Sequence, residues 1–215
     1  MQLIWKGQSC FEISSSQGKD NRVTIVIDPF DEDTGLRLPK LEADVLLITH
    51  QHHDHNNKKA VSGNPFLIDG PGEYEVKGVF VQGIQAFHSA SGEKDQNTIY
   101  TISVEDLRIC HLGDLGQKEL TPEQVEQIGE VDILLIPVGG VFTISAKEAV
   151  KIMSQIEPSI IIPMHYQIPK LKIKLEGLDK FLKTMGMKSA IPLDKLTIKK
   201  KDIISEEAKI VVLNP

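Results

Sequence analysis

The sequence predicts an α/β protein in which packed β-sheets carry helices on their outside. Three observations support this class. The first half of the chain consists mainly of short strand-like segments, and the second half alternates strand-like and helical segments. Several apolar runs are continuous, as in strands buried on both faces. With 215 residues, 40% of them hydrophobic and 25% charged, we expect one domain over residues 1–215.

Seven segments of the first half have the composition of strands. Residues 22–28 (RVTIVID) are rich in β-branched side chains, and residues 44–49 (DVLLIT) form a short apolar run. Glycine-rich turns, such as residues 70–78 (GPGEYEVKG), separate several of the strands. The remaining strands are predicted at residues 66–69, 79–81, 84–87, 98–104 and 107–110.

The second half contains helix signals between buried strands. A helix is predicted over residues 122–128, because Thr121 can cap its start and a proline occupies its first position. A second helix is predicted over residues 145–156, where Ser145 and Glu148 have the spacing of a capping box. A third helix at residues 177–185 and strands at residues 132–137, 159–164 and 208–213 complete the prediction.

Charge is distributed unevenly along the chain. The formal net charge is −6, but residues 166–215 hold eleven Lys against six acidic residues, a net of +5 that leaves −11 on the rest. The acidic body argues against a long polynucleotide as the partner. The basic C-terminal part could steer a small anionic substrate, and lysines solvated on exposed faces are the alternative explanation.

Cysteine usage and hydropathy indicate the compartment. Cys10 and Cys110 are far apart and form no C-x-x-C pattern, so a disulfide framework is not expected. The first residues lack the charged and apolar regions of a signal peptide, and no apolar run approaches the ~20 residues that span a bilayer. We therefore expect a cytoplasmic protein without a membrane partner.

The strongest signal for function is a dense group of metal-binding side chains. Four of the seven histidines, His50, His52, His53 and His55, lie within six residues, and Asp54 is among them. This run directly follows a predicted strand, at the edge where α/β sheets place their chemistry. Residues two apart in an extended segment point the same way, so His50 and His52 can share one metal. A turn then lets Asp54 and His55 face a second metal. A solvated histidine-rich turn is the alternative.

Three further polar residues follow apolar strands in the same way. His88 follows residues 84–87, Asp114 ends the segment CHLGD, and His165 follows the strand SIIIPM. Taken singly, each could be an exposed loop residue. Their recurrence at strand ends instead predicts one site built from several strands, with imidazole and carboxylate ligands that suit zinc and its first-row neighbours.

These segments resemble the metallo-β-lactamase superfamily. Residues 132–140 (DILLIPVGG) and the helix that follows resemble, in particular, the branch that includes ascorbate-phosphate-lactonase-like hydrolases. The matching pieces occur in the family's order and span most of the chain: T-H-Q-H-H-D-H at residues 49–55, His88, L-G-D at residues 112–114 and P-M-H at residues 163–165.

The resemblance implies a four-layer αβ/βα sandwich, in which two mixed β-sheets are flanked by helices and the metals lie at one edge. It also implies a metal-dependent hydrolase with two divalent ions, zinc first, with manganese or iron as alternatives. By motif position, one ion binds His50, His52 and His88, the other binds Asp54, His55 and His165, and Asp114 bridges both.

The implied mechanism is attack by a hydroxide held between two metal ions, since one zinc ion alone lowers the pKa of bound water to about 7. Asp54 would orient this hydroxide. The substrate class is a small ester or lactone, or a phosphoester, because the fold itself does not choose the bond. A metal-bound water or His111 could protonate the leaving group.

Several neighbours of these ligands have two interpretations each. We expect His53 to be exposed. His111 and Asp28 could orient a ligand or simply pack at a strand end. Tyr166 could face the substrate or lie on the surface.

Two other functions remain open at this stage. Some relatives load iron at a similar site and perform redox chemistry, and ligand types alone separate zinc from iron poorly. A non-catalytic binding module stabilised by metal is the second alternative, although structural zinc sites are usually closed by four protein ligands. The sequence contains no signal for an oligomeric state.

Overall fold

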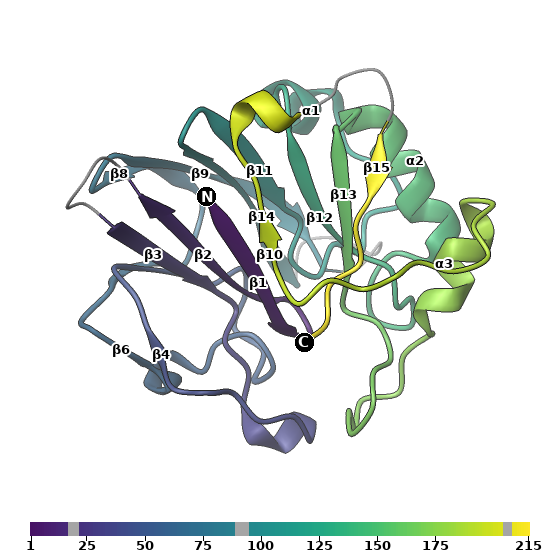
Figure 1. Cartoon of the computed structure of the whole chain (residues 1–215), viewed down its shortest axis with the longest axis horizontal. Helices are drawn as coiled ribbons and strands as arrows, with labels where there is room; N and C mark the ends of the chain where they lie inside the picture. Colours follow the sequence, from purple (N-terminus) through teal and green to yellow (C-terminus); the bar gives the residue numbers. More distant parts are fainter. Residues whose placement is uncertain (17–21, 89–94, 204–207) are drawn as a thin grey trace.

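The computed structural model describes residues 1–16, 22–88, 95–203 and 208–215, and two facing β-sheets form its centre (Figure 1). The first sheet is mixed: β1, β2 and β3 pair antiparallel, and β3, β5 and β7 pair parallel. Its six strands lie in the order β14 (Leu196–Thr197), β1 (Gln2–Gly7), β2 (Cys10–Ser16), β3 (Arg22–Ile27), β5 (Val45–Leu47) and β7 (Phe66–Ile68).

The second sheet is also mixed. An antiparallel part contains β8 to β11, and a parallel part contains β11, β12, β13 and β15. Its seven strands lie in the order β15 (Lys209–Ile210), β13 (Ile160–Met164), β12 (Ile133–Pro137), β11 (Leu107–His111), β10 (Gln96–Val104), β9 (Val79–Phe87) and β8 (Gly72–Val76).

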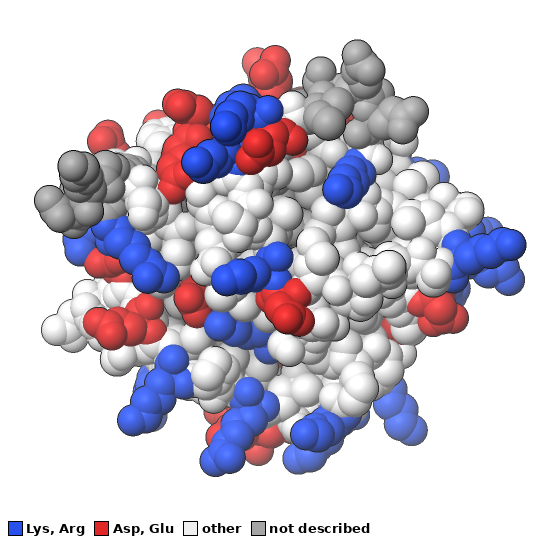
Figure 2. Space-filling model, in the orientation of Figure 1, with Lys and Arg blue, Asp and Glu red and all other residues white. Residues whose placement is uncertain are grey.

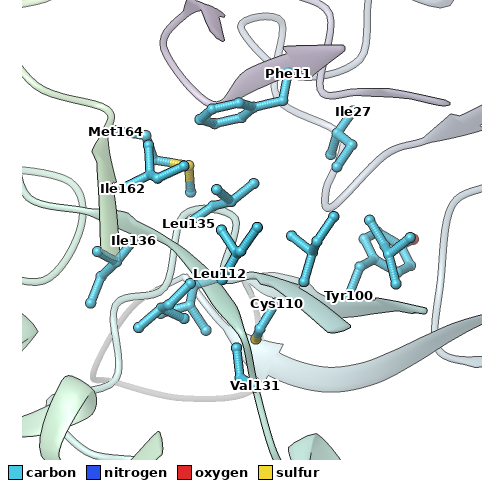
Figure 3. Close-up of a cluster of buried hydrophobic side chains, with 14 of the residues drawn as sticks. Phe11, Ile27, Tyr100, Cys110, Leu112, Val131, Leu135, Ile136, Ile162 and Met164 are labelled. Atoms are coloured by element: carbon cyan, nitrogen blue, oxygen red, sulfur yellow. The ribbon is translucent and has the colours of Figure 1, made fainter. Parts of the chain in front are cut away.

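The main core lies between the two sheets. Phe11 and Ile27 from the first sheet lie opposite Leu135 and Ile162 from the second, and all four side chains are fully buried (Figure 3). Every residue of β12 and β13 is buried, which explains why these strands read as continuous apolar runs. Packing of two inner sheet faces thus fixes the relative position of their edges.

The outer faces are covered differently. Helices α1 (Pro122–Ile128), α2 (Ala146–Ile156) and α3 (Leu178–Thr184) come from the second half of the chain, and Figure 1 shows α2 and α3 outside the seven-stranded sheet. A two-stranded sheet of β4 (Leu41–Glu42) and β6 (Val61–Ser62) lies beyond the other sheet, where its apolar side chains join a second core cluster. Short 3₁₀ helices occur at η1 (Glu32–Thr34), η2 (Lys58–Ala60) and η3 (Lys200–Asp202).

The predicted fold class is confirmed, and both predicted helix starts have their caps. Thr121 accepts a hydrogen bond from the backbone N–H of Gln124. Ser145 and Glu148 form the complete capping box at the start of α2. These local signals were readable because capping involves residues only three apart.

Several strand predictions were incomplete or wrong: β4, β6 and β14 were not predicted, and the strand predicted at residues 208–213 covers only Lys209–Ile210. The hairpin of β1 and β2 was not predicted, although QLIWK and CFEIS both alternate in polarity. The segment of residues 70–78 was expected to be a turn, but it contains the strand β8. The predicted break within β9 is absent, because Gly83 continues the strand beside Gly70, where a Cβ would lie 2.6 Å from the Gly70 carbonyl oxygen.

Candidate metal centre

Strand ends bring the predicted ligands together. β9 and β11 both run antiparallel to β10, and β11, β12 and β13 are parallel, so the carboxyl ends of β9, β11 and β13 lie at one edge. His88 directly follows β9, Asp114 lies three residues beyond β11, and His165 directly follows β13. The segment of residues 50–55 arrives from β5 of the facing sheet. The structure therefore brings all seven predicted side chains to one place.

One group of ring nitrogens comes from His50, His52 and His88. Their possible ligand atoms all lie within 4.8 Å of one another. Nε2 of His50 is 3.1 Å from Nδ1 of His52, and the rings of His50 and His88 are 5.1 Å apart between centroids. Three imidazoles converging on a small volume are a ligand set that suits a first-row metal ion.

A second group consists of Asp54, His55, Asp114 and His165, which are all buried. Within it, Oδ2 of Asp114 lies 3.2 Å from Nε2 of His55 and 3.3 Å from Nε2 of His165. The same oxygen lies 3.3 Å from Nε2 of His88, which belongs to the first group. Asp114 is therefore in reach of both groups.

Asp28 fixes the orientation of two histidine rings. Its carboxylate accepts hydrogen bonds from the Thr49 backbone N–H at 2.8 Å and from the Thr49 hydroxyl at 2.7 Å. Nδ1 of His55 lies 2.9 Å from the same carboxylate, and Nδ1 of His50 lies 2.9 Å from the Thr49 hydroxyl oxygen. Because the hydroxyl proton goes to Asp28, the Nδ1–H of His50 must donate to Thr49. The Nε2 atoms of both rings then face the site.

The turn that carries Asp114 is held by glycine and asparagine. Gly113 has a φ of 56°, and a Cβ there would lie 2.3 Å from Oδ1 of Asn97. This Oδ1 accepts the Asp114 backbone N–H at 3.1 Å, and Ser9 donates its hydroxyl to Oδ1 of Asp114 at 3.3 Å. His111 donates from Nε2 to the Ser9 carbonyl at 2.9 Å and accepts the Gly113 N–H at Nδ1. Both ring nitrogens of His111 are thus engaged away from a substrate.

Sequence reasoning missed Gln8, which lies in the two-residue turn between β1 and β2. Gln8 is fully buried, and its Nε2 donates to Oδ2 of Asp54 at 3.4 Å. The backbone carbonyl of Gln8 accepts hydrogen bonds from Nε1 of Trp5 at 2.8 Å and from the His165 backbone N–H at 3.1 Å. The signal that could have revealed it is the Gly-Gln-Ser turn between two alternating segments.

Buried polar atoms without hydrogen-bond partners test whether the site fits a metal ion. Nε2 of His55 is buried and makes no hydrogen bond of good geometry, although Oδ2 of Asp114 lies 3.2 Å away and Asp28 orients the ring through Nδ1. A cation coordinated between this nitrogen and the neighbouring carboxylates would satisfy both. The donor set of nitrogens and carboxylate oxygens also suits zinc. The residues present therefore fit a metal ion.

The pKa values of the site reflect its burial and its closely spaced charges. Burial lowers the pKa of His50 to about 2, and the neighbouring His55 adds to this effect. Burial alone would lower the pKa of His55, but Asp114 and Asp28 outweigh it and hold that pKa well above its ordinary value. Burial would raise the pKa of Asp114, but His165 and His55 hold it well below. His50 is thus a neutral ligand, and His55 holds a proton that a cation can replace.

A cavity of about 320 Å³ opens onto these groups. Its lining residues are His52, His53, Asp54, His88, Asp114, Phe142, His165 and Ile173. Phe142 and Ile173 were not among the predicted site residues, because isolated apolar residues in loops carry no sequence signal.

The remaining candidates have clear positions. His53 is exposed, as expected, and its side chain lines the cavity. Tyr166 neither faces the cavity nor lies on the surface: it is buried, and its ring packs on Trp5 with 5.0 Å between centroids. Both interpretations of Tyr166 were therefore wrong. Cys110 is buried in the main core.

Two facing mixed sheets with a cluster of histidines and aspartates at one edge define a metallo-β-lactamase-type protein with a candidate metal centre. The beta-lactamase superfamily domain matches residues 2–165, a range that contains all seven candidate ligands, and the chain belongs to this family.

Two curated proteins and one solved structure illustrate what the chain is similar to. The chain is 33% identical over 185 residues to a UPF0173 protein of Pyrococcus abyssi, covering 77% of this chain and 83% of that protein. It is 34% identical over 200 residues to a UPF0173 metal-dependent hydrolase of Thermoplasma volcanium, with the same coverage of 77% and 83%. A crystal structure from Thermotoga maritima, described as a candidate Zn-dependent hydrolase of the metallo-beta-lactamase superfamily, has a TM-score of 0.80 at 39% identity and covers 99% of this chain and 97% of that one.

Proposed function

We propose that the protein is a metal-dependent hydrolase that holds two divalent metal ions, with zinc as the first candidate. The observation that carries this proposal is the position of Asp114, whose Oδ2 lies within 3.3 Å of Nε2 atoms from both ligand groups. In the proposed assignment, His50, His52 and His88 hold one ion, Asp54, His55 and His165 hold the other, and Asp114 contacts both. The relatives named as metal-dependent hydrolases support the metal-dependent hydrolase as the function.

Bound metal ions would supply a water that loses its proton near neutral pH and would polarise the scissile bond. The protein's own residues prepare the site. Asp28 and Thr49 orient the rings of His50 and His55 so that their Nε2 atoms face the ligand groups. Gln8 holds the carboxylate of Asp54, which we propose as the residue that orients the attacking water. Such outer contacts fix ligand geometry before substrate arrives.

A small ester or lactone is the favoured substrate class, and a phosphoester is the second candidate. Among the described residues that line the 320 Å³ cavity, none is Lys or Arg, so the protein itself offers no cationic side chain there for a phosphate. On the face that Figure 2 shows, basic side chains are dispersed among acidic and uncharged ones. This distribution gives no continuous basic track for a polynucleotide on that face.

The expected partner is therefore a small molecule. None of the helices in the described part of the chain has the length and apolar character that a membrane crossing requires. A cytoplasmic location and a single domain over residues 1–215 stay predictions.

The test is elemental analysis of protein purified without tag and without chelator, followed by a panel of ester, lactone and phosphodiester substrates. We expect about two zinc or manganese ions per chain and turnover of at least one substrate class. A His50→Ala, Asp54→Ala variant should lose metal and activity, whereas His53→Ala, which changes a histidine outside the ligand set, should keep its metal.

Other results would contradict the proposal. Bound iron with visible absorbance would indicate the redox alternative instead. Metal content in the wild type no higher than in the His50→Ala, Asp54→Ala variant would mean that the cluster is not a metal site.

A further inference from the structure

Two apolar side chains are exposed beside the candidate metal centre. Val141 and Phe142 lie in the loop between β12 and α2, and their exposed fractions are 67% and 53%. Phe142 lines the same cavity as the candidate ligands. A single exposed apolar side chain is ordinary, but one that lines a cavity beside candidate ligands is a candidate contact for a bound molecule.

The loop that carries Phe142 is held firmly on the site. A Cβ on Gly139 would lie 2.1 Å from the carbonyl oxygen of His165, so only glycine permits this contact with the end of β13. The Gly139 carbonyl accepts a hydrogen bond from the Glu176 N–H at 2.8 Å, and the Ile144 N–H donates to the Leu115 carbonyl at 2.9 Å. The loop is therefore fixed on both sides of Phe142 by main-chain hydrogen bonds.

The backbone of this loop is also strained. Val141 has a φ of 59°, in the left-handed region that β-branched residues rarely adopt. Such strain persists where the surroundings determine the conformation, and it is concentrated at functional sites. Here the strained turn places the adjacent Phe142 side chain at the cavity, and the Phe142 N–H closes the turn on the Gly140 carbonyl at 2.6 Å.

Ile173 supplies a second apolar side chain to the same cavity, from the segment that follows β13. This segment is anchored on both sides of Ile173. The Lys172 N–H donates to the Thr34 carbonyl at 2.8 Å, and the Leu175 N–H donates to Oε1 of Gln167 at 3.0 Å. One part of the cavity is thus lined by polar candidate ligands. The other part is lined by two apolar side chains, whose loops are anchored by hydrogen bonds of their main chain.

We propose that the site takes substrates that carry a small apolar group, an alkyl chain or an aryl ring, next to the bond that is cleaved. Phe142 and Ile173 bind this group while the scissile carbonyl faces the ligand groups. The cavity volume of about 320 Å³ is at the small end of ligand pockets, which limits the apolar group to a few carbons or one ring. The inference rests on the proposed metal centre and adds the substrate's chemical class to it.

The probe is a series of linear carboxylates, namely acetate, butanoate and hexanoate, titrated calorimetrically into the zinc-loaded protein. Their carboxylate can bind the metal, and only the chain length varies. Each methylene buried against Phe142 and Ile173 should raise affinity about two- to fourfold, the upper value being the equivalent of 0.8 kcal/mol. In Phe142→Ala the increase in affinity per methylene should shrink, while the affinity for acetate stays the same. In Ile173→Ala the increase per methylene should shrink less than in Phe142→Ala.

The matched control is Phe66→Ala, which removes a phenylalanine that is 51% exposed on β7 and does not line the cavity. It should keep the full dependence on chain length. Equal affinities for the three acids in the wild type would overturn the inference. It would also be overturned if Phe142→Ala and Phe66→Ala reduced the dependence of affinity on chain length by the same amount. Carboxylate binding requires no turnover, so an inactive protein with a normal chain-length dependence would contradict the proposed hydrolysis and still show that Phe142 and Ile173 bind an apolar group beside the metal centre.

Discussion

At the scale of single residues, Asp28 and Thr49 control the candidate ligands without belonging to them. Asp28 is fully buried and receives hydrogen bonds from Thr49 and from the ring of His55. This arrangement determines which nitrogen of each ring faces the site. Partners that orient metal ligands typically affect metal affinity 10–100-fold, roughly the effect expected here.

Thr49→Val tests this role, because valine keeps the shape of threonine and removes the hydroxyl. His50 then loses the acceptor of its Nδ1–H, and Asp28 loses one donor. We expect zinc affinity to fall about 10- to 100-fold in competition with a chromophoric chelator. Thr184→Val, at an exposed position of α3, should leave the affinity unchanged. An unchanged affinity in Thr49→Val would show that the hydroxyl does not orient His50.

Sequence reasoning found residues at this scale where their chemistry was conspicuous. The seven candidate ligands were predicted because histidines and aspartates at strand ends are unusual, and the structure brings all seven together. Gln8 and Phe142 were missed. Gln8 contacts His165, 157 residues away, and no local pattern marks such a contact.

At the scale of elements, the start of β5 is fixed between its two neighbours by Asp44. The Asp44 backbone N–H donates to the Thr24 carbonyl at 2.8 Å, and the Phe66 N–H donates to the Asp44 carbonyl at 2.8 Å. The carboxylate accepts the Thr24 N–H at 2.8 Å and pairs with Lys77 at 2.6 Å. Asp44 thus helps set the register of the strand that leads into residues 50–55.

This contact predicts a pH-dependent stability. Burial alone would raise the pKa of Asp44, but the hydrogen bonds from Lys77 and from the Thr24 backbone outweigh it and hold the pKa below its ordinary value of 3.8. A carboxyl whose pKa is lower in the folded state stabilises the protein above its unfolded pKa and loses this effect as the pH falls through the folded value. Asp44→Asn should therefore lower the free energy of unfolding by up to about 1 kcal/mol near neutral pH.

Denaturant titrations across pH 3–7 measure the difference in the free energy of unfolding between the wild type and Asp44→Asn. It should be constant above about pH 5 and should shrink below the ordinary aspartate pKa of 3.8. Asp33→Asn, at an exposed position of η1, is the control. A difference that stays constant down to pH 3 would show that the carboxylate's charge has no part in the contact.

At the scale of the whole molecule, the candidate site joins the two sheets. Residues 50–55 arrive from the first sheet, and His88, Asp114 and His165 arrive from the second. A metal ion that binds ligands from both sheets would bind the folded protein more tightly than the unfolded chain. Ligand binding of this kind stabilises the fold by mass action.

Chelation should therefore lower the melting temperature. A ligand at 100 times its dissociation constant contributes about 2.7 kcal/mol, which corresponds to roughly 5–10 °C for a protein of this size. We expect a shift of this order when zinc-loaded protein is treated with EDTA and monitored by calorimetry. The His50→Ala, Asp54→Ala variant should show no such shift. Identical melting curves for the loaded and chelated wild type would argue against a metal that links the sheets.

The sequence by itself determined the elements whose signals are local. Capping residues marked α1 and α2, continuous apolar runs marked β12 and β13, and the histidine run after β5 marked the site. These signals are readable because they depend on residues within a few positions of one another.

The tertiary structure alone decided how distant segments meet. It placed the hairpin of β1 and β2 so that Gln8 and Ser9 reach Asp54 and Asp114, 46 and 105 residues away. It also decided which ring nitrogens face the site and that Phe142 shares a cavity with the candidate ligands. The physical reason is that these contacts follow from the packing of two sheets against each other, which no spacing along the chain encodes.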